Sequence, residues 1–290
     1  MKNLSIFFKD TKPFGQLIGL LFILVVCFVI ATSLQMLVNV KGDSPTEIRM
    51  NILVTGLVQI VTFLGAALLF AILYHGKAIE YLKICGSRNK WGLGLLAIMI
   101  TLLLLPLVDQ LTIWNEGIHL GTIEEELRSL AEMNQKAVEK MLSLTTTGDF
   151  LLQLLVVALV PAVCEEAFFR GALQQVLHGC LKNAHVAIFV TALIFSLAHG
   201  DLYGFVPRFF LGVMLGYLFW MSGSLLVNIC AHFFNNALVV LMYYLHHRGV
   251  VLFDPSEPFG FPAWLVTICA MAAAGLFYLY FVKRSVNISK

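Results

Sequence analysis

Long stretches without a charged residue are the feature that most constrains this chain. Residues 13–40, 50–76 and 209–247 contain no Asp, Glu, Lys or Arg. A helix needs about 20 mostly apolar residues to cross the roughly 30 Å hydrocarbon core of a membrane. Hydrophobic residues make up 59% of the chain and charged residues 12%, against roughly 45–50% and about 25% in soluble domains. The surplus apolar side chains must face lipid, so the sequence predicts an integral membrane protein.

The intervals between charges predict eight membrane helices. They cover residues 13–40, 50–76, 91–108 with an extension past Asp109 towards Trp114, 150–165, 183–200, 209–221, 224–247 and 258–282. The uncharged run 209–247 is too long for one span, and Met221-Ser222-Gly223-Ser224 is a turn signal that divides it. No internal repeat or low-complexity segment is present. We therefore predict an all-α polytopic fold that forms a single integral membrane domain over residues 1–290.

One long linker, residues 115–148, carries a helical pattern of its own. Apolar residues recur at helical spacing between Leu127 and Leu142, with charges between them. Thr122 and Glu125 fit a capping box at the start of this helix. Residues 118–143 are thus expected to form an amphipathic helix on the membrane surface, or alternatively a lid over an intramembrane site.

The distribution of Lys and Arg predicts the orientation of the chain in the membrane. With the N-terminus in the cytoplasm, twelve of the 19 basic residues fall on the cytoplasmic side and seven on the other. Because cytoplasmic segments are enriched in Lys and Arg, both termini are expected to be cytoplasmic. Arg170 is counted inside and Arg208 outside in this map. We expect the membrane to be the cell membrane of a bacterium.

Two adjacent carboxylates late in the fourth span need an explanation, since a charge at a helix centre costs about 2.5–3.5 kcal/mol on insertion scales. Glu166 and Arg170 are four residues apart, so they share a helix face and can form an ion pair, whereas Glu165 points elsewhere. Pro161 is expected to kink the helix. The alternative interpretation is a helix end that emerges into the cytoplasm, where these charges are simply solvated.

Histidines in two further spans make the first interpretation stronger. His199 ends the fifth span, and His232 and Asn236 lie one helical turn apart within the seventh. Polar groups turn away from lipid towards the interior of a helix bundle, so the three sets are expected to converge. Imidazoles, carboxylates and an amide can activate water through a bound metal. They can also act directly, with a carboxylate as general base and the imidazoles stabilising an oxyanion.

These residues carry a family resemblance. Glu165-Glu166-x-x-x-Arg170, Phe195-x-x-x-His199 and His232-x-x-x-Asn236 occur in this order on successive spans. Over residues 151–244 the chain resembles the CPBP (or ABI) intramembrane proteases, which include the type II CAAX-processing endopeptidases. The resemblance implies that Glu165 activates the attacking water, that Glu166 and Arg170 support it, and that His199, His232 and Asn236 complete the site.

The sequence does not decide whether the site binds a metal. Zinc commonly takes three protein ligands and a water, and His199, His232 and Glu165 could supply the three. Glu165 cannot easily be a metal ligand and a free base at the same time. This set of residues therefore fits a metal-free site slightly better. The family is usually described as metalloprotease, although a metal-free glutamate mechanism has also been argued for it.

The predicted function is hydrolysis of a peptide bond inside or beside the bilayer. The expected partners are membrane lipid and a peptide or protein substrate that reaches the bilayer. A net charge of +2 argues against a nucleic-acid partner. Two alternatives remain: a catalytically silent immunity or scaffold protein of the same fold, and a proton-coupled transporter using the same Glu and His residues. Cys164 as a nucleophile is a weaker hypothesis, because buried thiols are usually inert.

Overall fold

The computed structural model describes residues 8–38, 42–84, 90–119 and 121–279. Within these ranges all regular secondary structure is helical. Among the described residues, six helices are long and apolar enough to cross a membrane, and two further apolar helices are shorter. The prediction of an all-α polytopic membrane protein is therefore confirmed. The predicted ends of the first and last spans, Val40 and Val282, lie outside the described residues.

The described helices follow the predicted intervals. The long ones are α1 (Pro13–Val38), α2 to α3 (Pro45–His75), α5 (Lys90–Glu116), α7 to α9 (Thr147–Leu181), α11 (Phe205–Ser222) and α12 (Leu225–His247). The shorter apolar helices are α10 (Ala184–Leu197) and α13 (Ala263–Phe277). Three elements lie between spans: α4 (Ala78–Tyr81), the 3-10 turn η3 (Gly121–Ile123) and α6 (Glu124–Leu142). The predicted turn between the sixth and seventh spans is confirmed, with Gly223 at a positive φ of 61°.

Two of the long helices contain π-helical segments. In the second span, η2 (Ile60–Gly65) joins α2 (Pro45–Gln59) to α3 (Ala66–His75). The fourth span runs through α7 (Thr147–Gln153), η4 (Leu154–Leu159), α8 (Val160–Glu166), η5 (Ala167–Gln174) and α9 (Gln175–Leu181), of which η4 and η5 are π-helical. π segments are rare and occur frequently at functional sites. Here η5 begins directly after Glu166, and η4 ends at Leu159, before α8.

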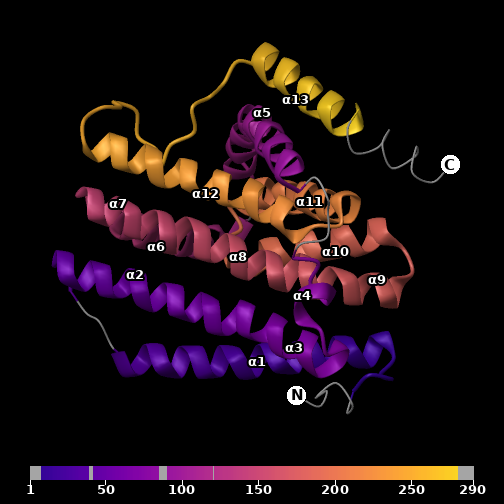
Figure 1. Cartoon of the computed structure of the whole chain (residues 1–290). Helices are drawn as coiled ribbons and strands as arrows, with labels where there is room; N and C mark the ends of the chain where they lie inside the picture. The colour runs from indigo at the N-terminus through magenta and orange to yellow at the C-terminus, as the bar shows by residue number, and fades with distance from the viewer. Residues whose placement is uncertain (1–7, 39–41, 85–89, 120, 280–290) are drawn as a thin grey trace.

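Pro161 is accommodated without ending the fourth span. It lies in the first turn of α8, directly after the π-helical η4. Because the bonding pattern has already changed in η4, the missing N–H of Pro161 falls where two helix types join. The helix continues to Leu181 (Figure 1). The prediction that the fourth span reaches the cytoplasm near Arg170 is therefore wrong: Arg170 is fully buried within the protein.

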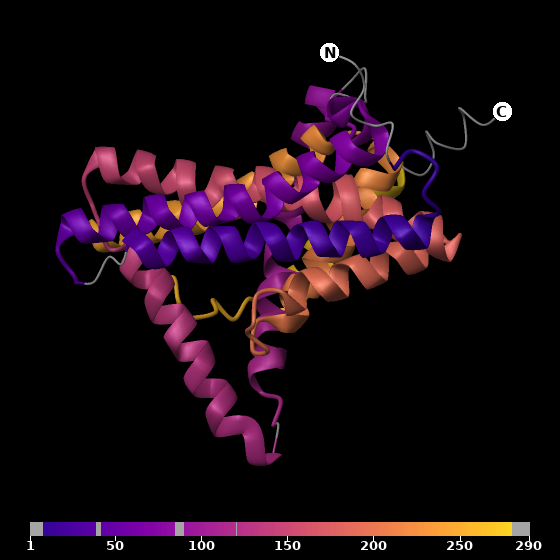
Figure 2. The same cartoon turned by 90° about the horizontal axis from the view of Figure 1, so that it is seen from below.

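The long helices pack as a layer that one helix crosses. In Figure 1, α1, α2 with α3, the α7–α9 rod and α12 lie side by side, and α5 is seen almost end-on. Figure 2 shows α5 lengthwise, running across the others, and shows α6 projecting away from the body. α5 packs against α11, α12 and α13. The α7–α9 rod, which carries both glutamates, is thus enclosed between α2–α3 on one side and α10 to α12 on the other.

The outermost helix of the layer shows which surface faces lipid. α1 buries only a narrow stripe of Leu20, Cys27 and Ala31. Phe22 and Phe28 on its other faces are exposed. A helix that is apolar all round yet buried on one stripe is expected where lipid covers the rest.

α6 confirms the predicted amphipathic helix but not its predicted cap. η3 precedes it, and the N-cap residue Ile123 makes no side-chain capping bond. The capping box of Thr122 and Glu125 is therefore wrong, because Thr122 lies inside the 3-10 turn instead of at the cap. A capping box is instead present at the start of α2, between Ser44 and Glu47. The tip of α6 is held by Arg128, which stacks on the Tyr203 ring and donates to the carbonyl of Glu116 at 3.2 Å.

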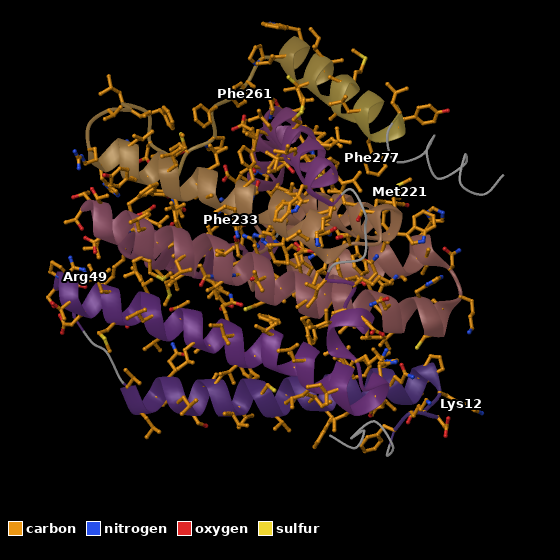
Figure 3. All side chains as sticks on the ribbon, in the orientation of Figure 1. Lys12, Arg49, Met221, Phe233, Phe261 and Phe277 are labelled. Carbon is orange, nitrogen blue, oxygen red and sulfur yellow. The ribbon has the colours of Figure 1, made fainter. Side chains whose placement is uncertain are left out.

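The orientation of the spans yields a testable topology. In Figure 3, Lys12 and Met221 lie at one end of the helix layer and Arg49 at the other. The excess of Lys and Arg on cytoplasmic segments predicts that reporter domains fused after Lys182 are cytoplasmic, and that those fused after Asp43, Gln135 and Ser256 are external. A fusion after Asn89, outside the described residues, should also be cytoplasmic. A cytoplasmic reporter signal at Gln135 would invert this map and remove α6 from the outer side.

Candidate active site

A fully buried ion pair lies at the centre of the molecule. Arg170 Nη1 donates to Glu166 Oε1 at 2.7 Å, and neither side chain is exposed. Two more donors reach the same carboxylate: Asn228 Nδ2 contacts Oε2 at 3.1 Å, and His232 Nδ1 lies 2.9 Å from Oε1. Arg170 also donates to the carbonyl of Gly212 at 3.2 Å. Both oxygens of Glu166 are therefore engaged, as a buried carboxylate requires.

Close helix packing makes the Gly212 contact available. A Cβ on Gly212 would lie 3.2 Å from the Ala192 Cα, and one on Gly216 would lie 2.7 Å from Ile188. The small residues of the Gly212-x-x-x-Gly216 pattern let α11 approach α10 closely. The carbonyl of Gly212 can then reach the Arg170 guanidinium.

Glu165 has a different environment from its neighbour. It is 6% exposed, and its Oε1 accepts one long hydrogen bond of 3.4 Å from Gln59 Nε2. Its Oε2 lies 3.9 Å from His232 Nε2, which is beyond hydrogen-bonding distance. One glutamate is thus bound by three side-chain donors, while the adjacent one keeps an oxygen free for another group.

His232 connects the two glutamates. Its Nδ1 faces the Glu166 carboxylate and its Nε2 faces Glu165. Since a carboxylate can only accept, Nδ1 carries the proton of the Glu166 contact. The contact fixes the ring and leaves Nε2 for chemistry, which is the arrangement by which a carboxylate orients a catalytic imidazole.

The Phe195-x-x-x-His199 pattern has a clear physical reason in the structure. The Phe195 ring packs under the Arg170 guanidinium, with Cζ 4.6 Å from the ring centroid. The same ring packs edge-on against the His199 ring at 5.0 Å. His199 Nδ1 lies 2.8 Å from the carbonyl oxygen of Phe195. Phe195 therefore couples the position of His199 to that of the buried ion pair.

A short fifth helix brings His199 to the site. α10 has 14 residues, about 21 Å at 1.5 Å per residue. The chain then turns back into α11 instead of crossing the full layer. The turn is held from α5 by Asn115, whose Nδ2 donates to the carbonyls of Leu202 and Tyr203 at 2.8 Å and whose Oδ1 accepts from Val206 N at 2.9 Å.

A cavity of about 250 Å³ joins the predicted residues. It is lined by Thr101, Phe195, His199, Arg208, Leu211, Met214, Leu215, Ala231, His232, Asn235 and Asn236. The structure thus brings His199, His232 and Asn236 to one space. Glu165 and Glu166 do not line it, but His232, which faces both carboxylates, does. Arg208, counted on the external side from the sequence, also lines this cavity and pairs with Asp201.

The described side chains do not assemble a metal site. Among the residues that the structure describes, no group of three or more His, Cys, Asp and Glu side chains could hold a metal ion. The set His199, His232 and Glu165 is therefore not arranged as three ligands to one ion. Cys164 is 1% exposed and does not line the cavity, which leaves it no place as a nucleophile in this arrangement.

The comparisons with known proteins bear on the same segment. Residues 147–238 match the family model described as Type II CAAX prenyl endopeptidase Rce1-like. This segment is a domain of the Rce1-like endopeptidase family. Neither curated proteins nor solved structures gave a match to the chain.

The Rce1-like domain contains every predicted site residue from Glu165 to Asn236. It begins at α7 and ends within α12, close to the predicted limits of 151 and 244. The family is one of proteases, so the match supports a CAAX-type intramembrane endopeptidase in general for this segment. α1 to α5, α6 and α13 lie outside the match.

Three polar residues that contact or position the site residues were not predicted from the sequence. Asn228 precedes His232 by one helical turn, and this spacing was a usable signal. Gln59 is a polar residue in the middle of the second span, which was also a usable signal. Asn115 has no such signal in the sequence, because its partners are backbone atoms 87 to 91 residues away.

The buried ion pair predicts a loss of folding on truncation. Arg170→Ala leaves the Glu166 carboxylate buried without its cation, and Glu166→Gln leaves the guanidinium without its anion. Breaking a buried pair in this way costs about 3–5 kcal/mol. Both variants should give a lower yield of folded protein and a lower melting temperature in detergent, whereas Lys77→Ala at the exposed pair with Glu80 should not. Wild-type stability in both buried variants would contradict the network.

Proposed function

We propose that the chain hydrolyses a peptide bond of an apolar peptide or protein segment at the membrane, with Glu165 as the general base. The observation that carries this proposal is the unequal partnering of the two glutamates: Glu166 is bound by Arg170, Asn228 and His232, while Glu165 keeps Oε2 free. A base must have a free oxygen within reach of the water that it deprotonates. Of the two carboxylates, only Glu165 has one.

The reaction uses one water for each bond cleaved. Glu165 accepts a proton from the water, and the water oxygen attacks the carbonyl carbon of the substrate. Asn236 donates from its side-chain amide to the oxyanion that forms, together with the Nε2 of a protonated His232 or His199. The C–N bond then breaks, and Glu165 returns the proton to the leaving amine. Glu166 and Arg170 take no part in proton transfer and keep His232 in position.

A second cavity supports an apolar substrate. It has a volume of about 400 Å³, lies between α5, α12 and the segment 253–261, and shares Leu211 and Asn235 with the first cavity. Its lining includes Leu105, Leu238, Met242 and Phe253. An apolar side chain or lipid-bearing segment that fills it would place a neighbouring peptide bond near Asn235 and Asn236. Membrane lipid is the proposed surrounding, with both termini in the cytoplasm.

The test of the base is an isosteric change at Glu165. Glu165→Gln keeps the shape of the side chain but cannot accept the proton, so turnover should fall by at least about 100-fold. The yield and the melting temperature should stay close to those of the unmodified protein. Cleavage of membrane peptides is followed as new termini by mass spectrometry, with the exposed Glu126→Gln as the matched control. Full activity in Glu165→Gln would exclude this role.

The folded, unmodified protein also distinguishes the alternative functions. A transporter or a silent scaffold of this fold would give no new peptide termini with either the unmodified protein or Glu126→Gln. Such a result in vesicles with a broad set of apolar peptides would contradict the proposed hydrolysis itself, independently of the role of Glu165.

The arrangement of donors also predicts the response to metal removal. Because the described side chains form no three-ligand group, the purified protein should contain well below one equivalent of zinc. Activity should survive moderate chelator. Elemental analysis and activity measured on the same sample provide the test. Stoichiometric zinc that is lost together with activity, and lost also in His199→Ala and His232→Ala, would restore the metalloprotease interpretation.

A further inference from the structure

A polar residue from outside the Rce1-like domain reaches the proposed base. Gln59 is the last residue of α2, directly before the π-helical η2. α2 and η2 both pack against α8, which carries Glu165. Gln59 Nε2 donates to Glu165 Oε1 at 3.4 Å. Within the described residues, this is the one hydrogen bond that Glu165 makes.

The contact with Gln59 gives the two oxygens of the Glu165 carboxylate different surroundings. Oε1 is held by Gln59, and Oε2 faces His232 Nε2 at 3.9 Å. A carboxylate held at one oxygen cannot rotate freely, so its second oxygen keeps a fixed direction. The 3.4 Å distance is long for a hydrogen bond, and catalytic hydrogen bonds are often long in a ligand-free protein. The direction of Oε2 is the property on which proton transfer depends.

Stability alone does not explain an amide at this position. Gln59 Oε1 is buried and has no hydrogen-bond partner, and the same holds for Thr62 Oγ1, three residues later. Leaving a polar atom buried and unpaired costs about 1–3 kcal/mol. Leucine or methionine would fill the same space in an apolar span without this cost. A residue that lowers stability while touching a proposed catalytic group is expected where function requires it.

We propose that Gln59 is a positioning residue for Glu165, fixing one carboxylate oxygen so that the other is directed at the water. The inference rests on the proposed function, in which Glu165 is the base. It assigns a role to the second span, which the family match does not cover. Gln59 itself accepts no proton and contacts no substrate in this role.

The experiment separates kcat from KM in two apolar variants. Gln59→Leu and Gln59→Met both remove the donor and the unpaired acceptor, and methionine keeps the unbranched shape. Each should lower kcat by about 10- to 100-fold, as misplacement of a catalytic group does. KM should change little, and the melting temperature should not fall, because the loss of one hydrogen bond is offset by removal of the unpaired oxygen.

Gln153→Leu is the matched control. Gln153 is likewise an amide in a span with a buried, unpaired Oε1, but its Nε2 donates to the carbonyls of Met141 and Leu144, away from the site. Its replacement should lower the melting temperature and leave kcat of the folded fraction unchanged. If Gln59→Leu and Gln59→Met behave in the same way as Gln153→Leu, Gln59 has only a structural role.

A double variant separates this inference from the proposed function. If Gln59 acts through Glu165, adding Gln59→Met to Glu165→Gln should cause no further loss of activity. Equal kcat in Gln59→Met and the unmodified protein, with Glu165→Gln inactive, would overturn the role of Gln59 alone. An active Glu165→Gln would instead overturn the proposed base. If either Gln59 variant fails to fold while Gln153→Leu folds, the amide is structural and the inference is also overturned.

Discussion

A carboxylate that is fully buried in an apolar protein must be paired, and the pairing of Glu166 determines the rest of this site. Arg170 supplies its countercharge one helical turn away, and Asn228 and His232 supply further donors from α12. These contacts tie α12 to the α7–α9 rod. They also fix the His232 ring, so that the position of Nε2 follows from a structural requirement instead of from contact with substrate.

The backbone, as well as the side chains, determines the geometry of the site. π-helical segments lie on both sides of Glu165 and Glu166 and again directly after Gln59. A π turn rotates the following residues relative to an α-helix, which changes the face to which each side chain points. The short α10 and the turn held by Asn115 then bring His199 to the same cavity as His232. Departures from regular helices therefore concentrate where the polar residues meet.

The sequence predicted the eight apolar helices and the convergence of His199, His232 and Asn236, because charges interrupt spans and polar groups avoid lipid. It placed Arg170 wrongly, since counting charges cannot distinguish a solvated arginine from one paired inside the protein. The sequence also did not predict the full length of the fourth span. Its charged residues are buried within the span and do not mark where it ends. Contacts such as that of Gln59 with Glu165 join residues 106 positions apart, and only the packing of α2 against α8 reveals them.

The central claim is that the two nitrogens of His232 have separate tasks, and His232→Asn tests it most directly. The asparagine amide can replace Nδ1 as a donor to Glu166 but has no atom at the position of Nε2. The account predicts a protein with near wild-type stability whose turnover is at least about 100-fold lower, with the exposed His119→Asn as control. Wild-type turnover in His232→Asn would contradict the assignment, as would a loss of folding equal to that of Glu166→Gln.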